Sequence, residues 1–414
     1  MDSGKAERLN GACFCMTLDR DTLASKLDQA VGVEGFAQKL ILSHPTLFSH
    51  VPVFVPLTTL HEMLAIVGAI ELAVQLPEYQ RAALAAAPPI ANRSFGPVGA
   101  FMGYDFHITT AGPQLIEVNT NAGGAFLNAV LAQAQRACCG GDDGFAELES
   151  EPNFGRSVAA MFVNEWRLQR ESGAPTLIAI VDDEPEQQHL FPEFQLAKAV
   201  LEQAGFEAVI SDASRLTLAE GRLTIDGRSI DLVYNRLVDF GFDEPRHAAL
   251  RIAYESGAVV VTPNPYVHAL LADKRNLALL SDSERLAQWG LPADARLSLK
   301  NGVPKTWLVT AANAGELWRD RSGLFFKPAR GHGSKVTRRV WSEITAGDYV
   351  AQTYAPPSLC GVSQAGERSK LKVDIRLYTY AGKLLIAAAR LYQGQTTNMR
   401  TPGGGFAPVL LVAE

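Results

Sequence analysis

The segment GYDFHITTAGPQLIEVNTNAGGA, residues 103–125, carries the strongest structural signal in the chain. It predicts two strands, at residues 104–109 and 114–119, which flank a turn at residues 111–113. An antiparallel hairpin is therefore expected in the N-terminal third of the protein.

Three polar side chains of this hairpin indicate a metal site. Folding the segment about Ala111 places Asp105 opposite Glu117, and Asn119 follows two residues later on the same face. Two carboxylates that face each other across an antiparallel pair repel each other, and a bound divalent cation removes that cost. Because all three side chains offer hard oxygen ligands, we expect them to bind Mg²⁺ or Mn²⁺. The alternative is a solvent-facing hairpin with scattered acids.

The sequence NAGG, residues 121–124, follows the hairpin. Its glycines are expected to bend the chain and to expose backbone N–H groups beside the metal.

The segment GLFFKPARGHGSKVTRRV, residues 323–340, suggests a phosphate site. An apolar strand delivers Lys327, and a Gly-rich loop with Gly331, Gly333 and Ser334 follows it. Glycines let backbone amides approach a phosphate closely, and a lysine neutralises its charge. This is not the Walker pattern, because no Gly-Lys-Ser/Thr opens a helix here. The alternative is a Gly-rich hairpin that merely turns.

The next segment, GDYVAQTYAPP at residues 347–357, is an apolar strand that ends near Gln352, Tyr354 and two prolines. It suits a hinge whose backbone faces the edge of an adenine. On its own it is only an edge strand blocked by proline.

Residues 371–409 predict two alternating strands that turn at Ala381 and Gly382, followed by the glycines 403–405. One asparagine and three arginines can project toward one side of this region: Asn398, Arg376, Arg390 and Arg400. Guanidinium groups beside a Gly-rich loop suit an anionic transition state or a carboxylate. The alternative is a solvated basic face. We favour the site, because the interleaved residues have the apolar character of a buried face.

Composition limits the class of protein. The chain has 414 residues, enough for two or three domains, and its 47% hydrophobic and 20% charged residues exclude wholesale disorder. A net charge of -6 argues against a general nucleic-acid or membrane surface. With no long apolar run, a cytoplasmic protein is expected. The five cysteines have no zinc-knuckle spacing, so we expect reduced thiols.

The pattern along the chain changes near Pro175. Before it, helical spacing dominates, as in the apolar stretch at residues 56–76. After it, residues 176–212 have the pattern of a β-α-β unit with buried parallel strands. A hairpin at Asp226 and Gly227 and a strand that holds Asn235 and Arg236 follow.

Together these segments resemble the ATP-grasp superfamily. VDIRLYTYAGKLLIAAAR followed by TTNMRTPGGGFA is similar to the "D-I-R" strand and the "R-x-N-x-x-x-G-G" loop of the branch that contains glutathione synthetase. The hairpin is similar to the element that ends in "E-V-N-x-x-P-G", although NAGG departs from that ending. TPNPYVHALLADKRNLALL resembles the "N-P…D-K" helix of the family, with Lys274 as its lysine. In ordinary members the hairpin comes last, so its early place resembles the circularly permuted order of glutathionylspermidine synthetase.

The resemblance implies a circularly permuted ATP-grasp fold of the α+β and α/β classes. It implies a helical region at residues 1–150 that carries the metal hairpin (95–130), a Rossmann-like α/β substrate domain at 174–265 and a nucleotide domain at 266–414. It further implies these roles: Asp105, Glu117 and Asn119 for Mg²⁺; Lys274, Lys327, Gly331, Gly333 and Ser334 for ATP phosphates; Gln352 and Tyr354 for adenine; Arg376, Arg400 and Asn398 for catalysis; Arg236 and Arg390 for substrate.

The implied activity is that of an ATP-dependent carboxylate–amine ligase. It would act on a small-molecule or peptide carboxylate and an amine acceptor, without nucleic acid or membrane, and a homodimer is a candidate assembly. One alternative is a protein that binds ATP as a regulatory ligand without catalysis. Another is a phosphotransferase on the same fold, for which His332 in the Gly-rich loop is the residue to test.

Overall fold

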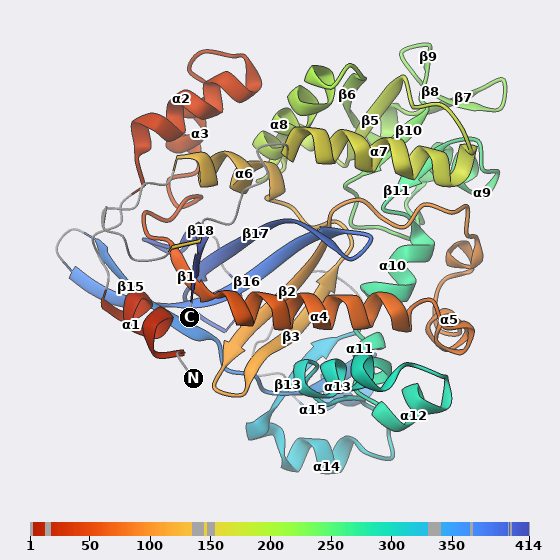
Figure 1. Ribbon diagram of the computed structural model, residues 1–414. Coiled ribbons are helices and arrows are strands. Elements are labelled where there is room, and N and C mark those ends of the chain that lie inside the picture. Colours follow the sequence, from red (N-terminus) through yellow and green to blue (C-terminus); the bar gives the residue numbers. More distant parts are fainter. Residues whose placement is uncertain are drawn as a thin grey trace.

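The structure is a computed structural model, and three sheets with their covering helices make up its main layers (Figure 1). It describes residues 3–12, 18–134, 145–146, 154–329, 341–364, 367–395, 397 and 400–413.

An eight-stranded sheet joins strands from both ends of the chain. Its order is β1-β18-β17-β16-β2-β3, with β15 beside β16 and β4 beside β18. Only the pairing of β1 with β18 is parallel. Its strands are β1 (Val53–Pro56), β2 (Met102–Thr109), β3 (Gly112–Asn119), β4 (Phe145–Ala146), β15 (Ser358–Gln364), β16 (Glu367–Tyr380), β17 (Lys383–Tyr392) and β18 (Gly405–Val412). The predicted turn at Ala381 and Gly382 is confirmed, because Tyr380 pairs with Lys383.

The predicted hairpin is formed by β2 and β3, and Asp105 pairs directly with Glu117 as expected. The predicted turn, however, is misplaced. Thr109 pairs with Gly112, so the loop lies one residue earlier than residues 111–113. A register shift after Asp105 leaves Ile116 as an extra residue in β3 and restores the predicted pairing.

Helix α4 (Leu57–Ala73) covers one face of this sheet, as Figure 1 shows. It confirms the helix predicted in the apolar stretch at residues 56–76. Met63, Val67 and Ile70 are completely buried in the core that α4 shares with the sheet. The other helices before the parallel sheet are α1 (Ser3–Ala12), α2 (Arg20–Val31), α3 (Phe36–Ser43), α5 (Pro77–Leu84), η1 (Pro89–Asn92), α6 (Ala125–Gln133) and α7 (Phe154–Arg170).

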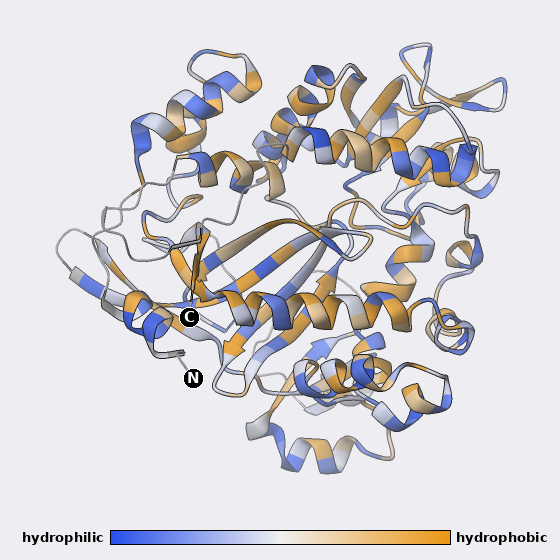
Figure 2. Cartoon of the chain, in the orientation of Figure 1, coloured by the Kyte–Doolittle hydropathy of each residue, from blue (hydrophilic) through white to orange (hydrophobic). Residues whose placement is uncertain are grey.

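A four-stranded parallel sheet of order β11-β10-β5-β6 confirms the predicted β-α-β unit. It consists of β5 (Leu177–Asp182), β6 (Glu207–Asp212), β10 (Leu232–Asn235) and β11 (Val260–Thr262), with helices η2 (Pro185–Gln187), α8 (Phe191–Gln203), η3 (Ala213–Arg215), η4 (Pro245–His247) and α9 (Ala248–Glu255). Figure 2 shows that its central strands are strongly hydrophobic, as expected for strands buried on both faces. The predicted turn at Asp226 and Gly227 joins two strands of a small sheet made of β7 (Thr217–Ala219), β8 (Arg222–Ile225) and β9 (Arg228–Ser229).

A third, antiparallel sheet has the order β12-β14-β13. It consists of β12 (Thr306–Leu308), β13 (Leu324–Pro328) and β14 (Tyr349–Thr353). Because β14 is the middle strand, the interpretation of residues 347–357 as an edge strand is wrong. The helices of this part are α10 (Pro265–Leu271), α11 (Asn276–Leu280), α12 (Ser283–Gln288), α13 (Ala293–Gly302), α14 (Ala314–Arg319), η5 (Arg321–Gly323) and α15 (Trp341–Ala346).

The helix expected around Lys274 is broken in two. Helix α10 ends at Leu271 and α11 begins at Asn276, so Lys274 lies in the turn between them. The Lys274 backbone N–H donates to the carbonyl of Ala329 at 3.2 Å, which joins this turn to the residue after β13.

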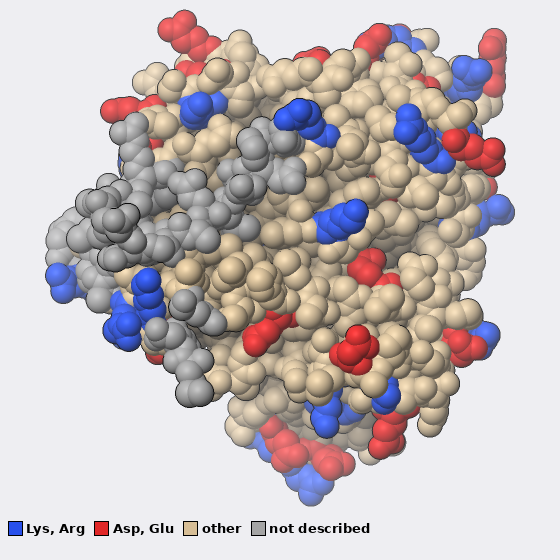
Figure 3. Space-filling model, viewed as in Figure 1, with Lys and Arg blue, Asp and Glu red and all other residues tan. Residues whose placement is uncertain are grey.

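Among the described residues, no single helix is long and apolar enough to cross a membrane, although the bent pair of α4 and α5 meets the length and composition test when taken together. On the face shown in Figure 3, basic and acidic side chains are scattered rather than gathered by sign.

Candidate functional site

A cavity of about 390 Å³ lies where the hairpin β2–β3 meets β13, β14, β16 and β17. Most of the residues selected from the sequence line it: Asp105, Glu117, Asn119, Arg236, Lys274, Lys327, Gln352, Tyr354, Arg376 and Arg390. Segments more than two hundred residues apart in the chain therefore meet in one place, because β16 pairs with β2.

One of the remaining selected residues, Arg400, is not brought to this cavity. Arg400 is exposed and is absent from the cavity lining, and its charge acts on His189 instead. Gly331, Gly333, Ser334, His332 and Asn398 lie outside the described residues.

Asp105 of β2 binds one arginine from the adjacent strand β16 and one from β17, the strand beyond it. Arg376 pairs with it across β16 and β2, and donates from Nε to Oδ1 at 2.5 Å and from Nη2 to Oδ2 at 2.7 Å. Arg390 donates to the same Oδ2 at 2.8 Å, and its Nε donates to Asp374 at 2.6 Å. Burial acts to raise the pKa of Asp105, but the two guanidinium groups outweigh it and hold the pKa well below its usual value.

Glu117 and Asn119 fit a metal better than Asp105 does. Asn119 Nδ2 donates to Asp105 Oδ2 at 3.1 Å and to Glu117 Oε1 at 3.3 Å. The oxygens of Asp105 thus accept four hydrogen bonds, and its side chain is only 3% exposed. The Glu117 side chain is 31% exposed and lies 3.9 Å from Lys274 Nζ, so it keeps lone pairs that face the cavity. Burial acts to raise the pKa of Glu117, but Lys274 and other nearby cations lower it below its usual value.

Lys327 is a buried cation that has no carboxylate in hydrogen-bond contact among the described residues. Its Nζ donates to the Ile116 carbonyl and to Gln352 Oε1, both at 2.8 Å. Burial lowers the pKa of Lys327 to about 8, and the attraction of Glu117 offsets only part of that change. The Gln352 Nε2 group is buried and has no hydrogen-bond partner in the described part of the chain. Such a group can donate a hydrogen bond to an acceptor atom of a bound ligand.

Arg236 follows β10 and enters the cavity from the parallel sheet. It is 6% exposed, and it donates to the carbonyls of Asn121 and Ala122 and to the Tyr234 hydroxyl rather than to a carboxylate. Its Nε has no partner among the described residues. A buried guanidinium that lacks a carboxylate partner favours an anionic ligand.

The expectation that the NAGG sequence exposes its backbone N–H groups is wrong at Gly124. The carboxylate of buried Glu193 accepts the N–H groups of Gly124, Phe126 and Leu127, at 3.0 to 3.1 Å. Glu193 thereby caps the beginning of α6, where a carboxylate complements the helix dipole.

Sequence reasoning missed several residues that line the cavity, including His107, Lys372 and Asp374. Strand alternation could have found them, because residues 372 and 374 share a face with Arg376, and residue 107 shares one with Asp105. The lining contains six basic side chains and three acidic ones: Arg236, Lys274, Lys327, Lys372, Arg376 and Arg390 against Asp105, Glu117 and Asp374. This excess favours an anionic ligand in a protein whose net charge is -6.

One known structure shares this arrangement of elements, and a second is more distantly similar. A glutathione synthetase-like effector from Globodera pallida, in its apo form, aligns over 95% of this chain and 98% of its own, with a TM-score of 0.56 and 13% identity. The fold is glutathione synthetase-like. A putative gamma-glutamylcysteine synthetase from Methylobacillus flagellatus aligns over 81% of this chain and 84% of its own, with a TM-score of 0.45 and 10% identity. No protein-family profile and no curated protein matches the sequence.

Proposed function

We propose that this protein is an ATP-grasp ligase that joins a carboxylate to an amine, with release of ADP and phosphate. The observation that supports it is the convergence, in one cavity, of an oxygen-ligand pair for a metal, the buried Lys327, the half-buried Lys274 and three arginines, two of them buried. The glutathione synthetase-like fold is in accord with this proposal.

In this proposal each side of the cavity has its own task. Glu117 and Asn119 hold Mg²⁺ or Mn²⁺, and Asp105 contributes mainly by orienting Arg376 and Arg390. The roles of the remaining side chains are these: Lys274 and Lys327 for phosphates, Gln352 and Tyr354 for adenine, and Arg236 for the substrate carboxylate. The loop with Gly331, Gly333 and Ser334, together with Asn398, would complete the site.

The proposed reaction has two steps. An oxygen of the substrate carboxylate attacks the γ-phosphorus of ATP, the bond to the β,γ-bridging oxygen breaks, and ADP leaves. Arg376 and Arg390 offset the negative charge that gathers on the transferred group. The amine then attacks the carbonyl carbon of the acyl-phosphate and loses a proton, an amide bond forms, and phosphate leaves. The metal, when bound, supplies further charge stabilisation to the phosphates.

We also propose that the chain is circularly permuted relative to ordinary ATP-grasp ligases. The support is spatial: β2, from the first third of the chain, pairs with β16, from its last tenth or so (Figure 1).

The decisive experiment measures ADP release from ATP and Mg²⁺ with pools of amino acids, short peptides and polyamines. We expect release that requires both a carboxylate and an amine, and an amide product by mass spectrometry. A phosphorylated product would favour the phosphotransferase. ATP binding without ADP release with any pair would favour the regulatory protein, and either result would contradict the ligase.

ATP affinity is expected to fall as the pH rises through about 8, the pKa of Lys327. The protonated ammonium attracts phosphate and the neutral amine does not, so affinity is highest below that pKa. Calorimetric titration at pH 7 to 9.5 should show the loss, with a decline of about tenfold per pH unit once the lysine is mostly neutral. A Lys327→Arg variant keeps its charge and should show a flatter profile. Equal declines in both proteins would exclude Lys327 as the titrating group.

A further inference from the structure

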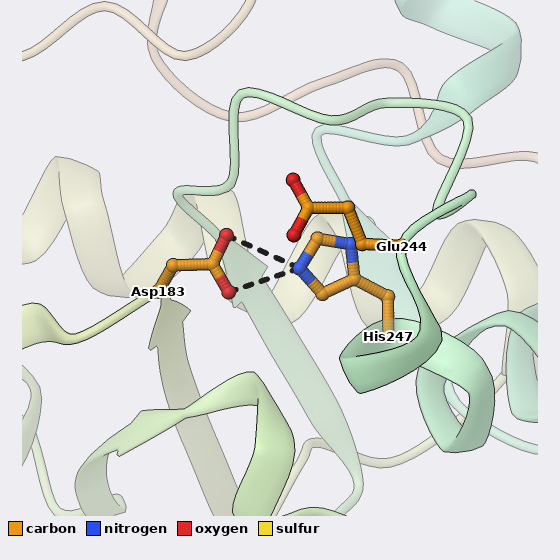
Figure 4. A group of neighbouring side chains, drawn as sticks. All are labelled: Asp183, Glu244 and His247. Atoms are coloured by element: carbon orange, nitrogen blue, oxygen red, sulfur yellow. Dashed lines mark hydrogen bonds and ion pairs between the residues drawn. The ribbon is translucent and has the colours of Figure 1, made fainter.

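A second cluster of ligand-type side chains lies at the carboxyl ends of β5 and β10, and its members are absent from the cavity lining. Asp183 follows β5, while Glu244 and His247 come from the loop and short helix after β10. One ligand atom from each residue lies within 4.8 Å of the others. Figure 4 shows the Asp183 carboxylate opposite a ring nitrogen of His247, with the Glu244 carboxylate beside the same ring.

His247 is held in one orientation by a fourth residue. Its ring is completely buried, and Nδ1 lies 2.9 Å from Asp239 Oδ2. The Asp239 carboxylate also accepts the backbone N–H groups of Gly241, Asp243 and Glu244, so it is fixed in place as an acceptor. With Nδ1 donating to this fixed acceptor, Nε2 faces Asp183 at 3.0 and 3.2 Å. In that tautomer Nε2 is an acceptor opposite a carboxylate, and a cation bound to both groups would remove the conflict.

The charges around this nitrogen also call for a cation. Asp183, Asp239 and Glu244 are three carboxylates around one imidazole. Arg246 offers only long contacts, 3.8 Å to Asp183 and 3.3 Å to Glu244, and its side chain is 42% exposed. A dication at Nε2 would balance Asp183 and Glu244. Because Glu244 is itself 51% exposed, solvent and metal can reach the site from that side.

We propose that Asp183, Glu244 and His247 bind one divalent transition-metal ion of the Zn²⁺ class. One imidazole nitrogen with carboxylate oxygens is a ligand set for Zn²⁺, Co²⁺ or Mn²⁺, whereas Mg²⁺ prefers oxygen alone. Asp239 is a positioning residue, since a carboxylate on the second ring nitrogen orients a metal-bound histidine.

The ion would fasten the loop after β10 to the end of β5. That loop begins with Arg236, whose backbone N–H donates to Val181 of β5 at 2.8 Å, and with Leu237, whose carbonyl accepts Asn121 Nδ2 at 3.2 Å. The metal would thus stabilise the carboxyl ends of the two central strands of the parallel sheet, from which Arg236 enters the cavity. This site does not depend on the proposed ligase activity.

The test uses metal-free, full-length protein titrated with Co²⁺ and Zn²⁺. We expect a visible Co²⁺ absorption band that saturates at one equivalent. Its wavelength should be that of Co²⁺ with a nitrogen atom among its ligands. We also expect a rise in melting temperature with Zn²⁺, because the ion binds the folded state. Zn²⁺ affinity, measured by competition with a chromophoric chelator, should weaken at least tenfold in Glu244→Gln and in Asp183→Asn.

Matched variants separate this site from other binding. Asp243 is an exposed acid of the same loop, and its carboxylate accepts a hydrogen bond from Arg251. The Asp243→Asn variant should keep the Co²⁺ absorption. Glu117→Gln changes the cavity instead and should keep it too. Glu244 is exposed, so its variant is expected to fold even where a His247 variant does not. An absorption that persists unchanged in Glu244→Gln and Asp183→Asn, or its absence from the unmodified protein, would overturn the proposal. His247 would then be held between Asp183 and Asp239 without a metal.

Discussion

Replacing Asp105 with Ala is expected to destabilise the protein by about 3–5 kcal/mol, the cost of leaving a buried ion pair without one partner. Asp105 is 2% exposed and accepts three hydrogen bonds from Arg376 and Arg390, whose side chains are only 9% and 12% exposed. In the Ala variant Arg390 would still bind Asp374, whereas Arg376 would lose the ion pair that it makes with Asp105. Urea unfolding at pH 7, followed by circular dichroism, measures the loss.

The free energy of unfolding at acid pH provides a second measure of the same interaction. The pKa of Asp105 is lowered in the folded protein, so its contribution is present above the unfolded pKa of about 3.9 and is lost as the pH falls below it. The Ala variant should therefore lose less stability between about pH 4 and 2 than the unmodified protein. Glu117→Gln removes a partly exposed carboxylate that lies 3.9 Å from Lys274, and should destabilise the protein less than Asp105→Ala does. Loss of less than about 1 kcal/mol in Asp105→Ala would show that the arginines do not depend on it.

The hairpin of β2 and β3 shows how far local pattern predicts this site. The sequence placed Asp105 opposite Glu117 correctly, but from a turn one residue too late. The extra residue at Ile116 shifts the register by the same amount and cancels the error. A bulge has no clear signature in apolar–polar alternation, since Leu115 and Ile116 are both apolar. The pairing was thus predictable, whereas its cause was not.

Contacts between distant segments were harder to predict. The arginines at 376 and 390 were selected as ligands for an anion, yet both bind Asp105, one from the adjacent strand β16 and the other from β17 beyond it. Such pairing depends on which strand lies beside which, and a sequence shows strands without their neighbours. Glu193 is a similar case, since its helix offers no sign that it caps α6. His247 and its carboxylates went unnoticed because they are brought together only by the ends of β5 and β10.

Replacing Glu117 with Gln is expected to reduce ATP-dependent turnover by about 10²- to 10³-fold, the usual effect of removing one pre-organised electrostatic contact to a transferring group. The change keeps the size of the side chain and removes only the charge. Of the proposed metal ligands, Glu117 is the one with its carboxylate open to the cavity, whereas the oxygens of Asp105 are occupied by Arg376, Arg390 and Asn119. The measurement is steady-state ADP release with the substrate pair found by the pool screen.

The dependence on metal concentration tells a ligand from a merely nearby acid. If Glu117 binds the metal, the variant should need more Mg²⁺ for half-maximal rate, and excess Mg²⁺ should restore part of the lost turnover. Glu62→Gln makes the same chemical change at an exposed position near the opposite end of the hairpin, beside Gly112, and should leave both quantities unaltered. A Glu117→Gln enzyme with full turnover and an unchanged Mg²⁺ requirement would move the metal away from this hairpin. Since the proposed reaction depends on a cation beside Lys327 and the arginines, the ligase assignment would fail with it.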